Sequence, residues 1–208
     1  MSYLRSTFRI LSVNLKHNFI PHLLIALVIA FMTQVLSGIT ALNTREAAQP
    51  LERMLSLTGI VLLTPIFLPE QNENIRDLIR SKRTDYLAVC VIRLLYSILF
   101  LAVIIGFFTY MMLCRESNVT IEHFVGGFAS ALFLGALGFF FAGLTQNTIT
   151  GYMVSAIYYI ANYSLKDELK NFYLFSMSAG SFTEKYWLLG GSVVIFAVTF
   201  FLLKYSRK

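Results

Sequence analysis

The amino-acid sequence predicts an all-α integral membrane protein, and two observations carry this prediction. Hydrophobic residues make up 57% of the chain and charged residues only 13%, and the mean hydropathy of +0.68 lies outside the range of ordinary soluble domains. The apolar residues also gather in six long blocks, and a helix needs roughly 20 such residues to cross a bilayer. These blocks cover residues 19–42, 54–68, 87–114, 124–145, 148–165 and 186–203.

The second block is the shortest of the six. Its apolar run reaches a full span only by extending back to Leu51 through Glu52 and Arg53, or where the lipid is locally thinner. We count it as a span, because the topology is otherwise odd. The sequence therefore predicts six transmembrane helices in a single domain, residues 1–208.

The distribution of basic residues predicts the orientation. With the N-terminus in the cytoplasm, ten Lys and Arg residues lie inside and six lie outside, which agrees with the positive-inside rule. Both termini are then cytoplasmic, and an anionic inner leaflet accounts for the net charge of +6. No basic stripe with interleaved aromatic residues lies outside the apolar blocks, so we expect no nucleic-acid partner. The inner ten are Arg5, Arg9, Lys16, Arg76, Arg80, Lys82, Arg83, Lys204, Arg207 and Lys208, and the outer six are Arg45, Arg53, Arg115, Lys166, Lys170 and Lys185.

The longest polar stretch, LPEQNENIRDLIRSKRTDY, joins the second and third blocks. Its acidic residues come early and its basic residues late, which suits a helix dipole. Ile75, Leu78 and Ile79 share one helical face, so the stretch predicts a short amphipathic helix in the loop 70–85 on the cytoplasmic side. A helix of about ten residues is marginal alone in water, so its apolar face needs cover. The inner leaflet and a groove on a cytoplasmic protein both remain open.

Two further segments are amphipathic. Residues 1–18 carry a stripe of apolar side chains beside basic ones, which predicts an N-terminal helix along the membrane surface. Residues 165–185 form the one sizeable outer element, which we expect to be interfacial or re-entrant. Its aromatic residues Phe172, Tyr173 and Phe175 are candidate anchors and a candidate outer gate.

Small and charged residues inside the blocks suggest helix contacts. Gly127, Ala131 and Gly135 recur at four-residue spacing, a pattern that lets helices approach closely, either within the chain or at a dimer seam. Arg93 lies about 10 Å into the third block, where it can snorkel to the inner surface or form an ion pair with Glu70 across the loop. The histidines are scattered without acidic partners, so the sequence predicts no metal site.

The layout and the residues PEQNENIRDLIRSK followed by VIRLL resemble the permease subunits of type-2 ATP-binding-cassette (ABC) transporters. The likeness in layout covers essentially the whole chain. Permeases of this family place a coupling helix between spans two and three, where it docks on a separate ATPase. The resemblance thus favours the protein groove over the leaflet. It implies an ATPase interface at Ile75, Arg76, Leu78, Ile79 and Arg80.

The resemblance also implies a function. The expected protein is a multi-pass permease of the cell membrane, in bacteria the inner membrane, that exports a hydrophobic or peptidic substrate. Its expected partners are ABC ATPase subunits, a second permease copy or a related permease, and membrane lipid. The chain has no G-x-x-x-x-G-K-[ST] loop, so ATP and Mg belong to the partner ATPase and this chain is not itself an enzyme. The alternatives are a secondary transporter or channel, and a non-transporting membrane scaffold.

Overall fold

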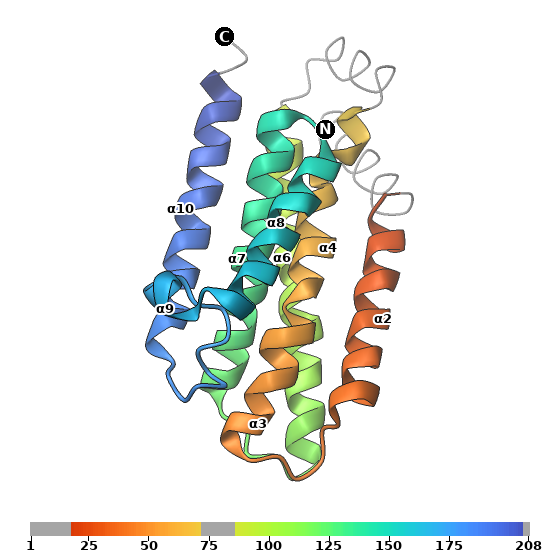
Figure 1. Ribbon diagram of the computed structural model, residues 1–208. Coiled ribbons are helices and arrows are strands. Elements are labelled where there is room, and N and C mark those ends of the chain that lie inside the picture. Colours follow the sequence, from red (N-terminus) through yellow and green to blue (C-terminus); the bar gives the residue numbers. More distant parts are fainter. Residues whose placement is uncertain (1–17, 72–85, 206–208) are drawn as a thin grey trace.

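The chain forms an elongated bundle of helices (Figure 1). The computed structural model describes residues 18–71 and 86–205, without the side chains of Glu70, Tyr86, Lys166 and Asp167. Within these ranges the chain is helical and contains no strand, as the sequence predicts. Five of its helical stretches are long and apolar enough to cross a membrane. They are Ile20–Ser37, Thr44–Pro69, Leu87–Cys114, Ile121–Thr145 and Thr183–Tyr205.

Four of these stretches are single α-helices. They are α2 (Ile20–Ser37), α6 (Tyr86–Cys114), α7 (Ile121–Thr145) and α10 (Thr183–Tyr205). The second stretch changes its winding along its length, through α3 (Thr44–Gln49), the π-helical η2 (Pro50–Leu55), α4 (Leu57–Leu63) and the 3₁₀-helical η3 (Thr64–Gln71). It runs back through Glu52 and Arg53 to Thr44, which gives the short second block the length of a span.

The block at 148–165 forms a shorter helix, α8 (Thr148–Ser164), of 17 residues. At 1.5 Å per residue this helix is about 26 Å long, slightly less than the roughly 30 Å of a bilayer core. The short helices α9 (Lys166–Leu169) and η4 (Lys170–Phe172) follow it. Residues 173–182 then fold back against the bundle as turns without regular helix, and we name this segment the inserted loop.

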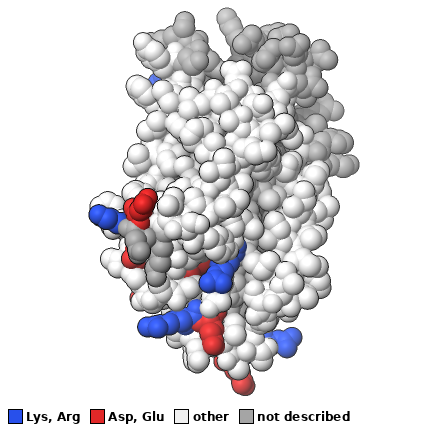
Figure 2. All heavy atoms as spheres, in the orientation of Figure 1, with Lys and Arg blue, Asp and Glu red and all other residues white. Residues whose placement is uncertain are grey.

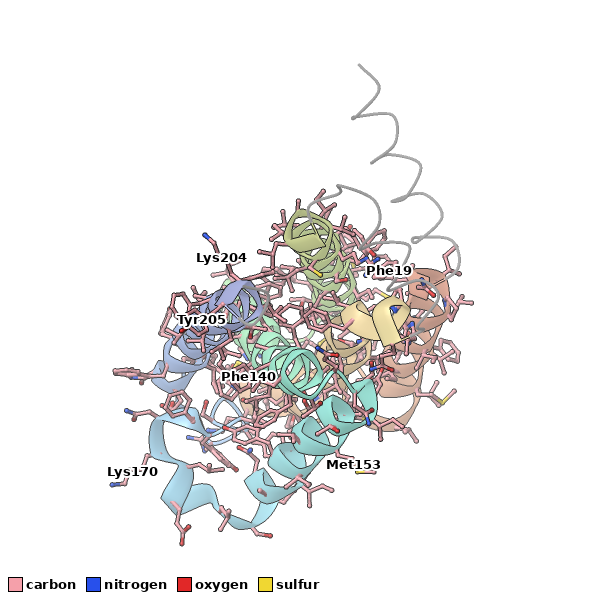
Figure 3. All side chains as sticks on the ribbon, turned by 90° about the horizontal axis from the view of Figure 1, so that it is seen from above. Phe19, Phe140, Met153, Lys170, Lys204 and Tyr205 are labelled. Atoms are coloured by element: carbon pink, nitrogen blue, oxygen red, sulfur yellow. The ribbon has the colours of Figure 1, made fainter. Side chains whose placement is uncertain are left out.

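Helix α7 lies at the centre of the bundle and contacts α4, α6, α8 and α10. In the view along the bundle in Figure 3, Met153 and Lys170 point outward. Small residues make the close approach possible. A Cβ on Gly59 would lie 1.8 Å from the backbone oxygen of Ala131, and a Cβ on Gly135 would lie 2.6 Å from the oxygen of Gly59. Only glycine allows the backbones of α4 and α7 to touch in this way.

The two ends of the bundle differ. At the upper end in Figure 1, α2 begins, η3 ends, α6 begins and α10 ends. At the lower end, the α2–α3 and α6–α7 connections are joined by hydrogen bonds from Ala41 N to Arg115 O (3.0 Å) and from Asn118 N to Leu42 O (2.9 Å). On the face shown in Figure 2, charged side chains gather over the lower part and leave a broad band above almost free of them. That band has the character of a lipid-facing surface.

Candidate functional site: a buried ion pair beneath the inserted loop

An ion pair between Glu52 of η2 and Lys185 of α10 lies buried near the lower end of the bundle. Glu52 Oε1 and Lys185 Nζ are 2.6 Å apart, and the two side chains are 0% and 2% exposed. Both residues lie in stretches that are long and apolar enough to span a membrane. Ionisable groups at such positions are costly unless they are paired, and they often mark functional sites.

The inserted loop supplies most of the remaining partners of the pair. Glu52 Oε1 accepts a hydrogen bond from the backbone N–H of Met177 (2.7 Å), and Oε2 accepts from the N–H (3.0 Å) and hydroxyl (2.6 Å) of Ser178. Lys185 Nζ donates to the backbone oxygen of Leu174 and to Ser130 Oγ, the latter at 2.7 Å. With Glu52 as third acceptor, the three ammonium protons of Lys185 all have partners.

The π-helical winding of η2 explains how an acidic residue comes to face the interior here. The N–H of Ser56 bonds to the oxygen of Leu51 at 3.1 Å, five residues earlier, so this turn is one residue wider than an α-helical turn. Leu51, Glu52 and Leu55 are fully buried, whereas Arg53 is exposed. A wide turn of this kind frequently accompanies a functional site in a helix.

Small residues of α7 make room for the pair and the loop. A Cβ on Gly126 would lie 2.2 Å from Met177 Sδ and 3.2 Å from Lys185 Cγ. Ser130, one helical turn further along the same face, is fully buried and accepts the hydrogen bond from Lys185. The first turns of α7 therefore accommodate the site through a glycine, Gly126, and a small polar residue, Ser130.

The three aromatic residues predicted as an outer gate lie beside this centre but differ in exposure. Phe175 is buried, with ring centroids 4.8 Å from Tyr163 and 5.7 Å from Tyr159. Phe172 is 39% exposed and its ring lies 5.8 Å from that of Phe133. Tyr173 is half-buried, with its ring centroid 5.8 Å from that of Phe175. Phe172 of η4 therefore packs against α7, whereas Phe175 of the inserted loop packs against α8.

Asn162 of α8 fixes the start of the inserted loop. Its side chain is fully buried, its Oδ1 accepts from the N–H of Leu174 at 2.8 Å, and its Nδ2 donates to the oxygen of Tyr158 at 2.7 Å. The hydroxyl of Tyr158 in turn donates to the oxygen of Phe172 at 2.5 Å. A side chain bonded in this way serves as a structural anchor for loop backbone that lies away from water.

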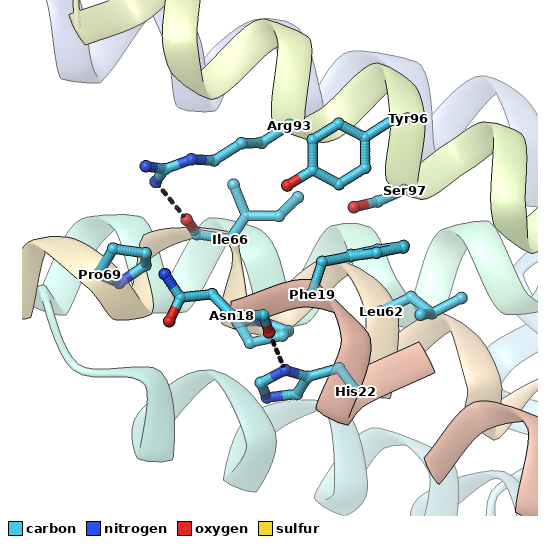
Figure 4. Close-up of a pocket in the computed structure, with 10 residues that line it drawn as sticks. Asn18, Phe19, His22, Leu62, Ile66, Pro69, Arg93, Tyr96 and Ser97 are labelled. Carbon is cyan, nitrogen blue, oxygen red and sulfur yellow. Dashed lines mark hydrogen bonds between the residues drawn. The ribbon is translucent and has the colours of Figure 1, made fainter. Parts of the chain in front are cut away.

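A second polar group lies at the upper end, between α2, η3 and α6 (Figure 4). Arg93 is only 3% exposed, and its Nη1 donates to the backbone oxygen of Ile66 at 3.0 Å. The Ile66 oxygen is available to Arg93 because η3 is a 3₁₀-helix that contains proline, and proline has no backbone N–H to donate to a carbonyl in the preceding turn. The predicted partner of Arg93, the carboxylate of Glu70, lies outside the described side chains, so the ion pair remains a prediction.

The other predicted site residues are placed as follows. Gly127, Ala131 and Gly135 face the second helical stretch of the same chain, where a Cβ on Gly127 would lie 3.3 Å from Leu51 Cβ. The predicted ATPase interface and the amphipathic N-terminal helix lie outside the described residues. The interface residues are Ile75, Arg76, Leu78, Ile79 and Arg80. No group of three or more potential metal ligands occurs in the part of the chain that the structure describes.

The Glu52–Lys185 pair was not predicted from the sequence. Glu52 was expected only to extend the second span, and Lys185 to be a charge of the outer loop. One signal was available, since an acidic and a basic residue stand at the edges of two apolar blocks and each needs a partner if its helix extends over it.

Comparisons with protein-family models, curated proteins and solved structures found no match to this chain.

Proposed function

We propose that this chain is the membrane-spanning permease subunit of a type-2 ABC transporter, and that it exports a hydrophobic or peptidic substrate using ATP hydrolysed by a separate ATPase. The observation that carries the proposal is that η3 ends and α6 begins at the same end of the bundle, where α2 begins and α10 ends (Figure 1). The polar stretch at 72–85 follows η3 and precedes α6 in the sequence. A coupling helix between the second and third spans requires this arrangement of its flanking helices.

The number of passages supports the same arrangement. With α8 crossing the membrane together with the five longer stretches, the chain passes six times, so both ends of the described chain lie on one side. The positive-inside rule makes that side the cytoplasm. The inserted loop then lies on the outer side, between the fifth and sixth passages, where the resembling permeases carry short segments that dip into the outer leaflet.

The proposed mechanism is mechanical. Closure of two ATPase subunits around ATP and Mg moves the coupling helix, and η3 transmits the movement because it continues directly from that segment into the bundle. Gln71, the last residue of η3, donates to Thr148 Oγ1 of α8 at 2.6 Å, so a shift of η3 also reaches α8. A second permease copy or a related permease completes the translocation path.

Co-purification tests this proposal. The tagged full chain, extracted from its native membrane in mild detergent, should recover a companion that hydrolyses ATP. The variants Leu78→Asp and Ile79→Asp place a charge on the predicted apolar face and should abolish recovery, whereas the control Ser81→Asp, on another face, should preserve it. The proposal fails if no ATPase accompanies the chain, or if Ser81→Cys can be labelled only from the exterior of the cell.

Arg93 offers a second test of coupling. Arg93→Leu removes the guanidinium that holds the Ile66 oxygen, so we expect transport-coupled ATP hydrolysis to fall. Arg93→Lys keeps a charge that can snorkel to the inner surface but loses the planar donor geometry. Unchanged coupling in Arg93→Leu would leave only the snorkelling role for this residue.

A secondary transporter is the second candidate, and one observation favours it. Such proteins carry ionisable residues inside their spans, and Glu52 and Lys185 both lie in apolar helical stretches. Liposomes that contain the chain alone distinguish the two candidates. Solute uptake driven by an ion gradient and lost in Glu52→Gln would support the second candidate, whereas transport that requires ATP and a companion would support the first. If neither activity is found, a non-transporting membrane scaffold remains as the alternative.

A further inference from the structure

Besides Asn162 and its apolar contacts, the ion pair binds the inserted loop to the bundle. Residues 174–178 supply partners to both members, since the oxygen of Leu174 binds Lys185 and the N–H groups of Met177 and Ser178 bind Glu52. These are backbone groups of a segment without regular helix, buried at Leu174 and Met177 and half-buried at Ser178. In an apolar environment they would otherwise lack partners, so the seated position of the loop depends on the two charges.

The loop also fills the space between the helices. Leu174 and Phe175 belong to one apolar cluster with Ile60 of α4, Leu134 of α7 and Leu188 of α10. Met177, 1% exposed, occupies the gap above Gly126. The loop is therefore a plug whose apolar side chains close the bundle between α4, α7 and α10 at its lower end. Its withdrawal would open that space.

Two backbone features mark the points about which the loop could move. Lys170, at the end of α9, has a φ of +43°, and Gly180 has a φ of +91°. The first conformation is strained for a residue with a side chain, and the second suits glycine. Both occur at the limits of the segment that carries Leu174, Met177 and Ser178. Within that segment Ser176 Oγ is buried and lacks a partner among the described residues.

We propose that the Glu52–Lys185 pair is a charge latch that holds the inserted loop closed, and that the loop is the gate of the bundle at this end. The latch opens when the two charges part, because the pair then no longer holds in place the Glu52 acceptor of two N–H groups and the Lys185 donor to the Leu174 oxygen. The role as an outer gate in transport rests on the proposed function, whereas the dependence of the loop on the pair does not.

Cysteine labelling tests the latch. The reporter is Ser176→Cys, since this side chain is 2% exposed and close in size to cysteine. Its hydroxyl has no hydrogen-bond partner among the residues that the structure describes, so its replacement should not disturb the loop. It is placed in the full chain after the native cysteines are replaced (Cys90→Ala, Cys114→Ala). The chain is reconstituted in liposomes, and the rate of reaction with a membrane-impermeant maleimide is measured from each side.

We expect Glu52→Gln and Lys185→Met to raise the labelling rate about 10-fold or more, because each leaves one buried group without its counter-charge. The matched controls are Glu46→Gln and Lys204→Met, which alter exposed charges and should leave the rate unchanged. Size-exclusion profiles and helical content show whether each variant is folded. If the charge variants do not fold, Ser178→Ala removes only one hydrogen bond to Oε2 and should raise the rate by a smaller factor.

The outcomes separate the latch from the proposed function. If the charge variants fold and are labelled as slowly as the parent, the latch is overturned. If they do not fold, the same slow labelling of Ser178→Ala overturns it. A faster rate in the variants supports it whether or not an ATPase partner exists. In a complex with the companion ATPase, nucleotide trapping should then change the labelling of the parent. If the variants open the loop but nucleotide has no effect, the latch stands and the coupling to ATP is wrong.

Discussion

Glu52 Oε1 and Lys185 Nζ lie 2.6 Å apart, in the second and the last of the apolar helical stretches. Neither residue is exposed, and each also binds the inserted loop or α7. A buried pair of this kind contributes little net stability compared with apolar residues of the same size, but removing one member is costly. The pair therefore specifies how the two helices and the loop meet, which makes it the natural place to test the fold.

Removing one charge should destabilise the protein more than removing both. We expect Lys185→Met to lower the free energy of unfolding by about 3–5 kcal/mol, because it leaves the carboxylate of Glu52 buried without a counter-charge. The double variant Glu52→Gln with Lys185→Met should recover part of the loss, since the Gln oxygen still accepts from the loop. The variants are heated in detergent, and the loss of the monodisperse size-exclusion peak gives the order of their stabilities. A double variant less stable than Lys185→Met would contradict this explanation.

Two serines of the inserted loop form a matched pair. Ser178 Oγ donates to Glu52 Oε2 at 2.6 Å, whereas the buried Ser176 Oγ has no partner among the described residues. Ser178→Ala should therefore cost about 1.5–3 kcal/mol, the range for a hydrogen bond to a charged group. Ser176→Ala should be neutral or slightly stabilising. Thermal stability in the same detergent compares them, and equal losses would show that the hydroxyls act only by packing.

Asn162 should determine how firmly the inserted loop is held. Asn162→Ala leaves the N–H of Leu174 buried without an acceptor, at a cost of about 1–3 kcal/mol. The control Asn118→Ala changes an exposed asparagine in the α6–α7 connection and should have no effect on stability. Limited proteolysis near the inserted loop should become faster only in Asn162→Ala. Equal rates of proteolysis in the two variants would show that Asn162 does not anchor the inserted loop.

The contact between α4 and α7 should depend on glycine at one position. Gly59→Ala would place a methyl group 1.8 Å from the backbone oxygen of Ala131, so the helices must separate, at a cost of about 1–3 kcal/mol. Gly190→Ala in α10 is the matched control, because nothing lies within 4 Å of its Cβ position. It should be neutral or slightly stabilising, since alanine favours helix. Comparable losses from both changes, measured by heating in detergent, would argue against the close contact.

Much of the fold was predictable because hydropathy acts locally. Five of the six predicted blocks coincide with helical stretches long enough to span a membrane, and the second gains its length by running back through Glu52. The block at 148–165 is also helical, but its 17 residues leave it shorter than the others. The winding within the second stretch was not predictable, since π and 3₁₀ turns depend on tertiary contacts more than on residue type.

The sequence by itself determined that this chain is helical and suited to a membrane, because a long apolar block must satisfy its backbone hydrogen bonds internally wherever it meets the bilayer core. It also marked a polar, amphipathic stretch between the second and third blocks. Only the tertiary structure decided that Glu52 meets Lys185 and that the inserted loop closes over them. That meeting depends on the wide turn of η2, the missing side chain of Gly126 and the path of the loop. Their combined geometry leaves no local pattern in the order of the residues.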